Sequence, residues 1–529
     1  MKSNQKLLLT SVFKPFSVDD EYGVKENVCE LMHNQVTRRQ GVFSVRSHNR
    51  SFGLSLIAEN LKVPTTVLDF PTIGEFVREL CKGQYTHVGI SFIVPNVDKA
   101  RRLAELTREH APGAKILLGG HGARIPGIAK IVQCDDICIG EGIRWLRQLF
   151  GEDVNTAIVH PVMPVDCKRA LLGVPTPNRK AILIPGVGCA NKCEFCCTSH
   201  FFDGYTPFFN GPEDMFAAME MISDRLKTSE FFVLDENFLD EPARVEKLIG
   251  LMKKHRRPFI FDIFSSLRAI SQYDPVTLVQ LGVQFIWIGV ESRRGLFEKT
   301  RGIDPAPVIR ALRDHGISVL ASSILFLEHH DQKSLWDDVD FTIGLEPDFI
   351  QFMELAPLPG TALYKRLEAK GRIRHEIPWR EWHGQDTIWF DHPHFNRRES
   401  KHILDSAFDR EYQILGPSLL RIAETRLRGL AWHPPAADAW LNARYAQMRD
   451  YAAEMRPLLP ALARFAPNDD IRCRARAAAK KFVDEFGPMS LGDRISGAIV
   501  MLAARLEQRR IRQGRSVLQP PTFIDRYRQ

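Results

Sequence analysis

The stretch LIPGVGCANKCEFCCTSH, residues 183–200, decides the fold and carries the strongest chemical signal of the chain. It places Cys189, Cys193 and Cys196 at the spacing Cys-x-x-x-Cys-x-x-Cys, directly after the apolar segment Ala181–Val187. Cysteine thiolates are the usual protein ligands of iron–sulfur clusters. Three of them on one short loop can hold three irons of a four-iron cluster and leave the fourth iron open to a small molecule. A structural zinc site is the alternative, but zinc normally takes four closed ligands in paired short spacings.

The cysteine spacing resembles that of the radical S-adenosylmethionine (SAM) enzymes, in which the open iron of a [4Fe-4S] cluster binds SAM through its amino and carboxylate groups. The resemblance covers about residues 181–365. Phe195, just before the last cysteine, fits the aromatic position usual in this superfamily. Asp235 and Glu236, in the run LDEN, stand where relatives bind the SAM amino group, which requires a carboxylate or carbonyl acceptor.

Later strand ends carry two further likenesses and one departure. Glu291 and Ser292, in the run GVES, resemble the segment that contacts the SAM ribose, whose two hydroxyls can both donate to a carboxylate. The run Pro357–Thr361 (PLPGT) resembles a signature common in cobalamin-linked members of the superfamily. Phe326 stands in a stretch where many relatives carry glycine, and a side chain there is expected to crowd the approach of adenine to the backbone.

Strand-like and helical runs alternate six times around these motifs. Six units resemble the open (β/α)6 partial barrel of radical SAM enzymes more than a closed eight-unit barrel. Chemistry in such barrels sits at the carboxyl ends of the strands, and the cysteine loop follows the first strand as that rule requires. The predicted strands are Ala181–Val187, Glu230–Asp235, Phe259–Phe264, Phe285–Val290, Ser318–Leu327 and Asp348–Leu355.

The first 150 residues or so show a second alternation of strands and helices. Such alternation predicts a parallel, doubly wound sheet with its ligand crevice at the carboxyl ends of the strands. The predicted strands are Lys6–Val12, Thr65–Phe70, Thr86–Phe92, Ala114–Gly119 and Asp135–Ile139, and the predicted helices are Phe52–Leu61, Ile73–Cys81, Val97–His110 and Ile143–Phe150.

A doubly wound domain ahead of a radical SAM barrel is similar to the cobalamin-binding domain of class B members of the superfamily. The runs ILLGGH (116–121) and IGEG (139–142), each after a predicted strand, carry this likeness. The Asp-x-His-x-x-Gly motif that coordinates cobalt from below in many methyltransferases is missing. Two alternatives therefore stand: a base-off cobalamin without a histidine ligand, or an empty scaffold. The cobalamin contacts that the resemblance implies are Ser91, Gly119, Gly120, His121, Gly140 and Glu141.

Breaks in periodicity divide the chain into four segments. After about Gly371 the strands stop, and the final residues from about Ser516 are expected to form a loose tail. The predicted segments are a cobalamin-binding-like Rossmann domain (1–151), a proline-containing linker (152–180), a radical SAM partial barrel (181–370) and a mainly helical C-terminal domain (371–529).

The bulk composition is that of an ordinary soluble protein. The 529 residues are 44% hydrophobic and 26% charged, with a net charge of +7 that does not by itself favour nucleic acid as a partner. No apolar run is long enough for a membrane span, and the N-terminus does not read as a signal peptide. Ten cysteines without secretory context predict a reducing, cytoplasmic location.

Two C-terminal segments have more than one interpretation. Trp379–Phe395, rich in histidine and tryptophan, lines an active site or forms a packed connector. The predicted helix Ile495–Ile511 has an apolar first half and a basic second half, so it either packs into a core or lies on an anionic membrane surface. The second interpretation favours a lipid-like substrate.

The resemblance implies an enzyme that cleaves SAM and abstracts hydrogen from an unactivated carbon, with cobalamin-dependent C-methylation of a hydrophobic small molecule as the leading hypothesis. An external one-electron reductant of the flavodoxin or ferredoxin type is the expected partner, and peripheral membrane contact is a further expectation. The alternatives are a cobalamin-independent cyclase, C–C coupling or rearrangement enzyme, and a cobalamin- or redox-sensing binding protein. An RNA methylthiotransferase is disfavoured because the cysteines of the first domain lack the contexts of a second cluster. No catalytic residue is assigned.

Overall fold

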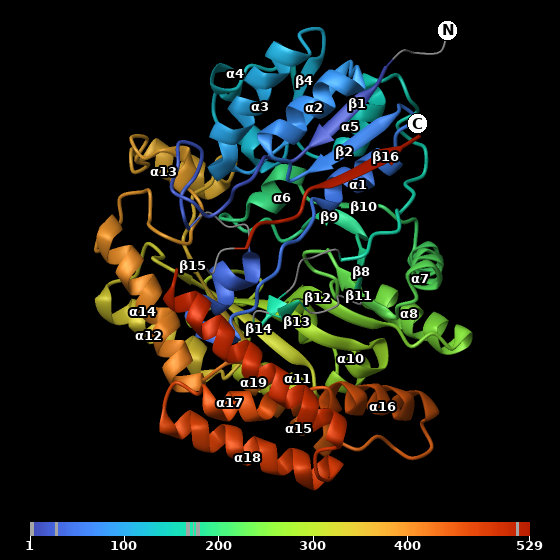
Figure 1. The fold of residues 1–529 in the computed structure, drawn as a ribbon, viewed down its shortest axis with the longest axis vertical. Coiled ribbons are helices and arrows are strands. Elements are labelled where there is room, and N and C mark those ends of the chain that lie inside the picture. Colours follow the sequence, from blue (N-terminus) through green and yellow to red (C-terminus); the bar gives the residue numbers. More distant parts are fainter. Residues whose placement is uncertain are drawn as a thin grey trace.

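The computed structural model describes residues 5–26, 30–165, 170–172, 174–175, 180–514 and 518–528. An α/β unit built from the first part of the chain lies at the top in Figure 1, an open barrel fills the middle, and a helical unit lies at the bottom. The predicted fold class, a doubly wound domain followed by a partial barrel and a helical domain, is confirmed.

The N-terminal sheet has the strand order β16-β2-β1-β3-β4-β5. The order 2-1-3-4-5 is a doubly wound arrangement of flavodoxin type, whose switch point lies between β1 and β3. All pairs within it are parallel except the one between β16 and β2. The strands are β1 (Leu7–Thr10), β2 (Thr65–Asp69), β3 (His87–Ser91), β4 (Lys115–Gly119), β5 (Asp136–Ile137) and β16 (Phe523–Tyr527).

The helices of this domain start where the sequence supplies caps. Thr72 and Glu75 form a capping box at the start of α2, each side chain meeting the other residue's backbone N–H. The Glu141 carboxylate accepts the backbone N–H groups that open α5. The helices are α1 (Phe52–Glu59), α2 (Ile73–Gly83), α3 (Val97–His110), α4 (Ile128–Ile131) and α5 (Gly142–Leu149), with short 3-10 turns η2 (Gly41–Phe43), η3 (Val94–Asn96) and η4 (His121–Arg124).

The end of the chain returns to this first domain, so the expectation of a loose tail is wrong. Strand β16 pairs antiparallel with β2 along the edge of the sheet (red ribbon beside β2 in Figure 1). Arg526 donates to both carboxylate oxygens of Glu79 at 2.9 and 3.0 Å, and the Arg50 guanidinium lies 4.3 Å from the Phe523 ring centroid. The segment covers an edge that would otherwise present unpaired backbone groups.

The barrel sheet has six parallel strands among the described residues, in the order β15-β14-β13-β12-β11-β8. Strands β8 and β15 form its two edges, so the barrel is open. The strands are β8 (Lys180–Leu183), β11 (Glu230–Val233), β12 (Ile260–Ser266), β13 (Val283–Glu291), β14 (Ser318–Leu325) and β15 (Phe349–Glu354). The helices are α7 (Pro212–Leu226), α8 (Pro242–His255), α9 (Leu267–Ile270), α10 (Pro275–Leu281), α11 (Pro305–Asp314), α12 (Gln332–Gly344) and α13 (Ala362–Ala369).

Alternating residues of the barrel strands face two different cores. Ile286 and Ile288 pack with the surrounding helices, whereas Trp287 and its neighbours on the inner face meet a segment of the first domain. That segment, residues 32–45, carries the single π-helical turn η1 (His33–Thr37), and its Val36 and Val45 are buried against the inner face of β13 to β15. The long connection between β1 and α1 therefore fills one side of the barrel.

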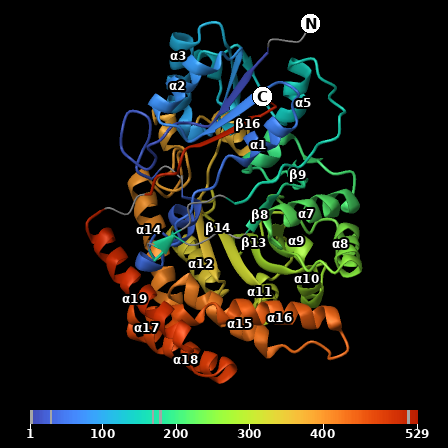
Figure 2. The same ribbon diagram turned by 45° about the vertical axis from the view of Figure 1, so that its right-hand side comes forward.

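Helices cover the far end of the molecule after the 3-10 turn η5 (Trp379–Glu381). They are α14 (Arg397–Leu415), α15 (Ser418–Ala431), α16 (Ala439–Ala453), α17 (Leu459–Arg464), α18 (Asp469–Phe486) and α19 (Leu491–Arg512), with the turn η6 (Arg456–Leu458) between α16 and α17. None of the helices in the described ranges is both long and apolar enough to cross a membrane. Figure 2 shows α19 along an outer edge of the molecule.

The predicted linker, 152–180, falls partly outside the described residues. In its described part, β6 (Ala170–Leu171) and β7 (Val174–Pro175) form a small antiparallel pair, and Pro164 bridges to Ala181 of the barrel. The four predicted segment boundaries remain predictions.

Deleting β16 by ending the chain after residue 517 is expected to lower the melting temperature by about 5 °C, because β2 loses five paired residues and Glu79 loses its arginine. Differential scanning calorimetry of the full-length and shortened chains measures the change. A chain that lacks only residues 528 and 529 is the matched control and keeps the strand. Equal melting temperatures for all three chains would contradict the stabilising role of β16.

Candidate active site

The cysteine loop is held by a short hairpin at the mouth of the barrel. Strand β9 (Gly186–Gly188) pairs antiparallel with β10 (Tyr205–Pro207), and the loop and helix α6 (Cys197–Phe202) lie between them. Gly188 has a φ of +86°, and a Cβ atom there would stand 1.8 Å from the carbonyl oxygen of Gly204. The approach of these two backbone segments therefore requires glycine at 188.

The loop brings the three predicted ligands together as free, half-buried thiols: Cys189, Cys193 and Cys196. Burial is the main reason that the pKa of Cys189 rises to about 11, and the nearby carboxylate of Glu236 and the other two thiols raise it further. Burial also raises the pKa of Cys193. Binding of a metal cluster would therefore release protons from this loop.

The barrel supports the loop from its last helix. The backbone N–H of Leu363, in α13, donates to the carbonyl oxygen of Glu194 at 2.9 Å, and Arg366 pairs with the Glu194 carboxylate at 3.2 Å. Phe195 packs edge-on against Phe297, with ring centroids 4.9 Å apart. The segment between the last two cysteines is thus fixed by contacts on both sides.

The two carboxylates predicted to meet the SAM amino group have different surroundings. Asp235 is buried and accepts hydrogen bonds from the Tyr205 hydroxyl and the Asn237 backbone N–H, both at 3.0 Å, and it pairs with Arg244 at 3.5 Å. Glu236 is exposed to solvent, yet desolvation by surrounding protein, followed by the Asp235 charge, raises its pKa. Asp235 is buried and engaged by three partners, whereas the side chain of Glu236 reaches solvent, so Glu236 is the carboxylate available to a ligand.

Glu291 adopts a strained backbone conformation at the end of β13. Its φ is +65°, in the left-handed region that side chains other than glycine rarely adopt, and it follows an irregularity in the pairing of β13 with β14. Its carboxylate is buried and pairs with the Lys299 ammonium at 2.5 Å. Burial lowers the pKa of Lys299, but the charges of Glu291 and Cys193 outweigh it and raise the pKa overall. Lys299 is therefore a cation placed between the cysteine loop and the predicted ribose segment.

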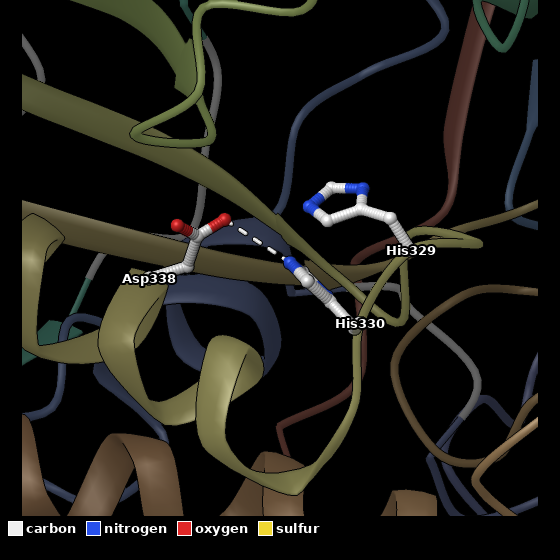
Figure 3. A group of neighbouring side chains, drawn as sticks. All are labelled: His329, His330 and Asp338. Atoms are coloured by element: carbon white, nitrogen blue, oxygen red, sulfur yellow. Dashed lines mark hydrogen bonds and ion pairs between the residues drawn. The ribbon is translucent and has the colours of Figure 1, made fainter.

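A histidine–aspartate pair holds the predicted ribose segment in place. Asp338, in α12, accepts a hydrogen bond from His330 at 3.1 Å and from the Arg293 backbone N–H at 3.3 Å (Figure 3). The Ser292 hydroxyl also bonds to Asp338, and these bonds outweigh burial and lower its pKa. The side chain of Asp338 thus joins the loop after β14 to the loop after β13.

His329, His330 and Asp338 lie close enough together to be considered as a metal site. The hydrogen bonding argues against it. Nδ1 of His330 accepts the backbone N–H of Leu327 at 3.1 Å, so Nε2 carries the proton that it donates to Asp338. A metal-bound histidine instead donates from its second nitrogen to an acceptor. The group therefore positions the loops and is not a metal centre.

The ring of Phe326 lies in the core beyond the end of β14, and the expectation that it would crowd adenine stays a prediction. Its φ is +60°, so the backbone takes a shape usually reserved for glycine. The ring is fully buried and packs against Phe395 at a centroid distance of 5.2 Å. Its side chain therefore belongs to the core.

A cavity of about 310 Å³ opens at the carboxyl ends of β3 and β4, between the sheet and helices α1 and α5. Its walls are mostly apolar or small, and helix α6 of the barrel closes one side through Phe201 and Phe202. Five of the six predicted cobalamin contacts line it: Ser91, Gly119, Gly120, Gly140 and Glu141.

These five residues are present for different physical reasons. Gly120 has a φ of +80°, and a Cβ there would stand 2.6 Å from the Phe92 carbonyl oxygen, so the turn requires glycine. A Cβ on Gly119 would meet no atom within 4 Å, so its missing side chain leaves open space in the cavity. The Glu141 carboxylate is occupied by the cap of α5.

The sixth predicted contact, His121, lies outside the main cavity. It lines a small neighbouring pocket of about 10 Å³ with Arg124 and the Leu358–Gly360 part of the PLPGT run. Its ring is 4.8 Å from that of Phe201, and burial followed by the Arg124 charge lowers its pKa to about 4. His121 and the PLPGT run therefore meet at the junction of the two α/β units.

The histidine- and tryptophan-rich stretch contains core residues. Trp382 and Trp389 are buried and stacked, with centroids 5.4 Å apart. His392 bonds to the Leu327 carbonyl oxygen at 3.0 Å, and Asp386 pairs with Lys401. His383 is the exception, because both of its ring nitrogens are buried without a hydrogen-bond partner. The other four residues named here have partners within the protein, as expected of a packed connector between the barrel and the helical domain.

Lys299 and the pair of His330 and Asp338 belong to the candidate site but were not predicted from the sequence. None of them stands in a recognisable motif, because each reaches the site from a loop or a helix after its strand. An exposed-looking lysine eight residues after Glu291 carries no signal of its own.

Comparisons with known proteins agree with this architecture. The structure of the radical SAM methyltransferase TsrM from Kitasatospora setae, with cobalamin and a [4Fe-4S] cluster bound, is similar with a TM-score of 0.54 and 15% identity, over 85% of this chain and 100% of that one. The TsrM structure with tryptophan substrate and the SAM analogue aza-SAM bound gives a TM-score of 0.53 and 14% identity, over 85% and 99% of the two chains. At this identity the likeness shows the fold.

One curated protein is similar in sequence over about half of the chain. The uncharacterized methyltransferase PH0819 of Pyrococcus horikoshii is 22% identical over 266 residues, which are 49% of this chain and 56% of that protein. The chain thus spans about half the length of this curated relative. No protein-family model matches the chain. The chain therefore shares its fold, a doubly wound domain followed by a partial barrel and a helical domain, with the structure of TsrM.

Asp338→Asn is expected to weaken the predicted binding of SAM about tenfold, because Ser292 and the Arg293 backbone lose one charge-assisted anchor. Equilibrium dialysis with labelled SAM measures the dissociation constant, and the iron content should stay unchanged. Asp340→Asn on the same helix, whose partner is the surface residue Arg410, is the matched control. Equal SAM affinity in both variants would remove the positioning role of Asp338.

Proposed function

We propose that the chain is a cobalamin-dependent radical SAM methyltransferase that acts on an unactivated carbon of a hydrophobic small molecule. The observation that carries the proposal is the position of α6. This helix starts at Cys197, directly after the cysteine loop, and ends with two phenylalanines in the wall of the 310 Å³ cavity. The cysteine loop and a cavity that can take the nucleotide base of a cobalamin are therefore adjacent, as transfer of a methyl group between SAM and a second cofactor requires.

The residues at the barrel mouth fit a [4Fe-4S] cluster with SAM. Cys189, Cys193 and Cys196 supply three thiolates, and no fourth ligand is required because SAM takes the open iron. Glu236 is the acceptor for the ammonium group of SAM, and Glu291 is the acceptor for its ribose hydroxyls. The Lys299 ammonium, now paired with Glu291, stands where it can meet the SAM carboxylate.

The cavity of the first domain fits the flat nucleotide base of a base-off cobalamin. Its small residues at 89, 119, 120, 140 and 142 leave a slot between sheet and helices, and its lining includes the carboxyl ends of strands on both sides of the switch point. When bound, the cluster supplies the electron that cleaves SAM, and cobalamin supplies a carrier for the methyl group. The chain's own residues orient these groups and exclude water.

The substrate proposed is a lipid-like or otherwise apolar small molecule. This rests on helix α19, whose apolar first half and basic second half are typical of a helix that lies on a lipid surface. An external one-electron reductant of the flavodoxin or ferredoxin type completes the system. An oxygen-sensitive cluster requires a reducing compartment, and we place the enzyme in the cytoplasm.

Replacing Cys189, Cys193 and Cys196 together with alanine is expected to abolish both iron binding and formation of 5′-deoxyadenosine from SAM. Anaerobic reconstitution followed by iron analysis and chromatography of the SAM products measures both. Cys473→Ala, at an exposed cysteine on α18, is the matched control and should retain about four irons per chain. Turnover of SAM in the triple variant would overturn the central assignment.

Gly119→Leu is expected to prevent cobalamin binding while the iron content stays at the wild-type level. The new side chain occupies open cavity space without backbone strain, since Gly119 has an ordinary φ and no neighbour within 4 Å of its Cβ position. Cobalt is measured after hydroxocobalamin loading and desalting, and about one cobalt per wild-type chain is expected. Gly74→Leu, at an exposed glycine of α2 outside the cavity, is the control.

The triple cysteine variant tests the iron–sulfur cluster, and Gly119→Leu tests cobalamin binding independently of it. Wild-type protein that holds four irons but no cobalt would make the first domain a scaffold and move the function to cyclisation, C–C coupling or rearrangement. The product mass then decides, because methylation adds one carbon and two hydrogens and cyclisation adds no carbon.

A further inference from the structure

Helix α19 presents a continuous row of large apolar side chains to solvent. The row consists of five residues with their exposed fractions: Leu491 (75%), Ile495 (55%), Ile499 (58%), Leu502 (58%) and Leu506 (50%). Spacings of four, four, three and four residues place them on one face of the helix. Soluble monomers rarely leave an apolar row of this length uncovered, and such a patch marks an interaction surface.

The exposed apolar row is not the face by which α19 packs on the helical domain. The opposite face of α19 is anchored, with Gly497, Ala503 and Ala504 buried against the helical domain. A capping box between Ser490 and Asp493 fixes the start of the helix, and Arg456 pairs with Asp493 at 3.3 Å. Core packing, one of the two interpretations of this segment, therefore accounts for one face only and leaves the apolar row unexplained.

The charges beside the row have one sign. Four arginines are exposed along the helix: Arg494, Arg505, Arg509 and Arg512. The two acidic residues of α19 are both engaged, Asp493 with Arg456 and the buried Glu507 with Arg510 at 3.3 Å. The outward surface of the helix is thus apolar and cationic, and its complement is a surface that is apolar and anionic.

A second copy of the chain does not supply that complement. An antiparallel pairing of two α19 rows centred near Ile499 sets Arg494 of one copy against Arg505 of the other, and a parallel pairing sets each arginine against itself. Like charges held opposite one another oppose association. Helix α19 runs along an outer edge of the molecule (Figure 2).

We propose that α19 docks this protein, in the plane of the bilayer, on a membrane surface that contains anionic lipids. The leucine and isoleucine side chains enter the boundary between headgroups and acyl chains, and the flanking arginines meet the lipid phosphates. The opposite face of α19 stays packed on the helical domain, so docking does not require the helix to detach or unfold. The proposal uses no cofactor and does not rest on the proposed methyltransferase activity.

Flotation of the full-length chain with lipid vesicles tests this docking. The wild-type protein is expected to float with phosphatidylcholine vesicles that contain phosphatidylglycerol, to stay behind with phosphatidylcholine alone, and to be released at high salt. Ile499→Asp combined with Leu502→Asp, or Arg505→Glu combined with Arg509→Glu, should each lower the vesicle partition coefficient at least about tenfold. Ile414→Asp, at a 46% exposed isoleucine on α14, is the matched control and should bind as the wild type does.

All replaced positions are exposed, and circular dichroism with melting curves verifies that the variants are folded. Equal binding to neutral and anionic vesicles, or no binding to either, would overturn the proposal. Light scattering runs in parallel: a dimer that dissociates on Ile499→Asp would assign the row to a second copy and likewise overturn it. Flotation that occurs only when an acidic protein is bound to the vesicles would also overturn the proposal.

Discussion

The backbone approach of Gly188 to Gly204 is the contact on which the candidate active site depends. It closes the hairpin of β9 and β10, and this hairpin carries the cysteine loop and α6 between its strands. The loop is tied to the barrel through α13, and α6 forms one wall of the cavity in the first domain. The carboxyl ends of two separate parallel sheets therefore meet at a single short segment, and a side chain at residue 188 would push them apart.

Features that depend on local sequence could be predicted. The cysteine spacing, the six barrel strands and the five parallel strands of the first sheet each follow from runs of a few residues with a definite period. The glycines at 119, 120 and 140 were found for the same reason, because a turn directly after a buried strand has its own residue pattern. Glu141 was predicted as a cobalamin contact from the same kind of pattern. Its carboxylate lies beside the cavity but accepts the backbone N–H groups at the start of α5, which the pattern did not indicate.

Features that depend on distant partners could not be predicted. Lys299 gains its place from the fold of a loop, and Asp338 reaches the predicted ribose segment from a helix 46 residues further along the chain than Ser292. The filling of the barrel by residues 32–45 requires the relative placement of two domains. The backbone conformation of Phe326 could not be predicted from its residue type. It has a φ usually adopted by glycine, and its ring is anchored in the core against Phe395.

Strand β16 makes the first domain the last to be completed. The barrel and all the C-terminal helices are, in topological terms, an insertion of roughly 390 residues between β5 and β16, which are the two opposite edges of one sheet. At a synthesis rate of about 10 residues per second, that insertion separates the two parts of one sheet by roughly 40 s on the ribosome. The edge of β2 stays open during this interval. The N-terminal sheet therefore cannot reach its final form until residues 523–527 have left the exit tunnel, long after its other five strands.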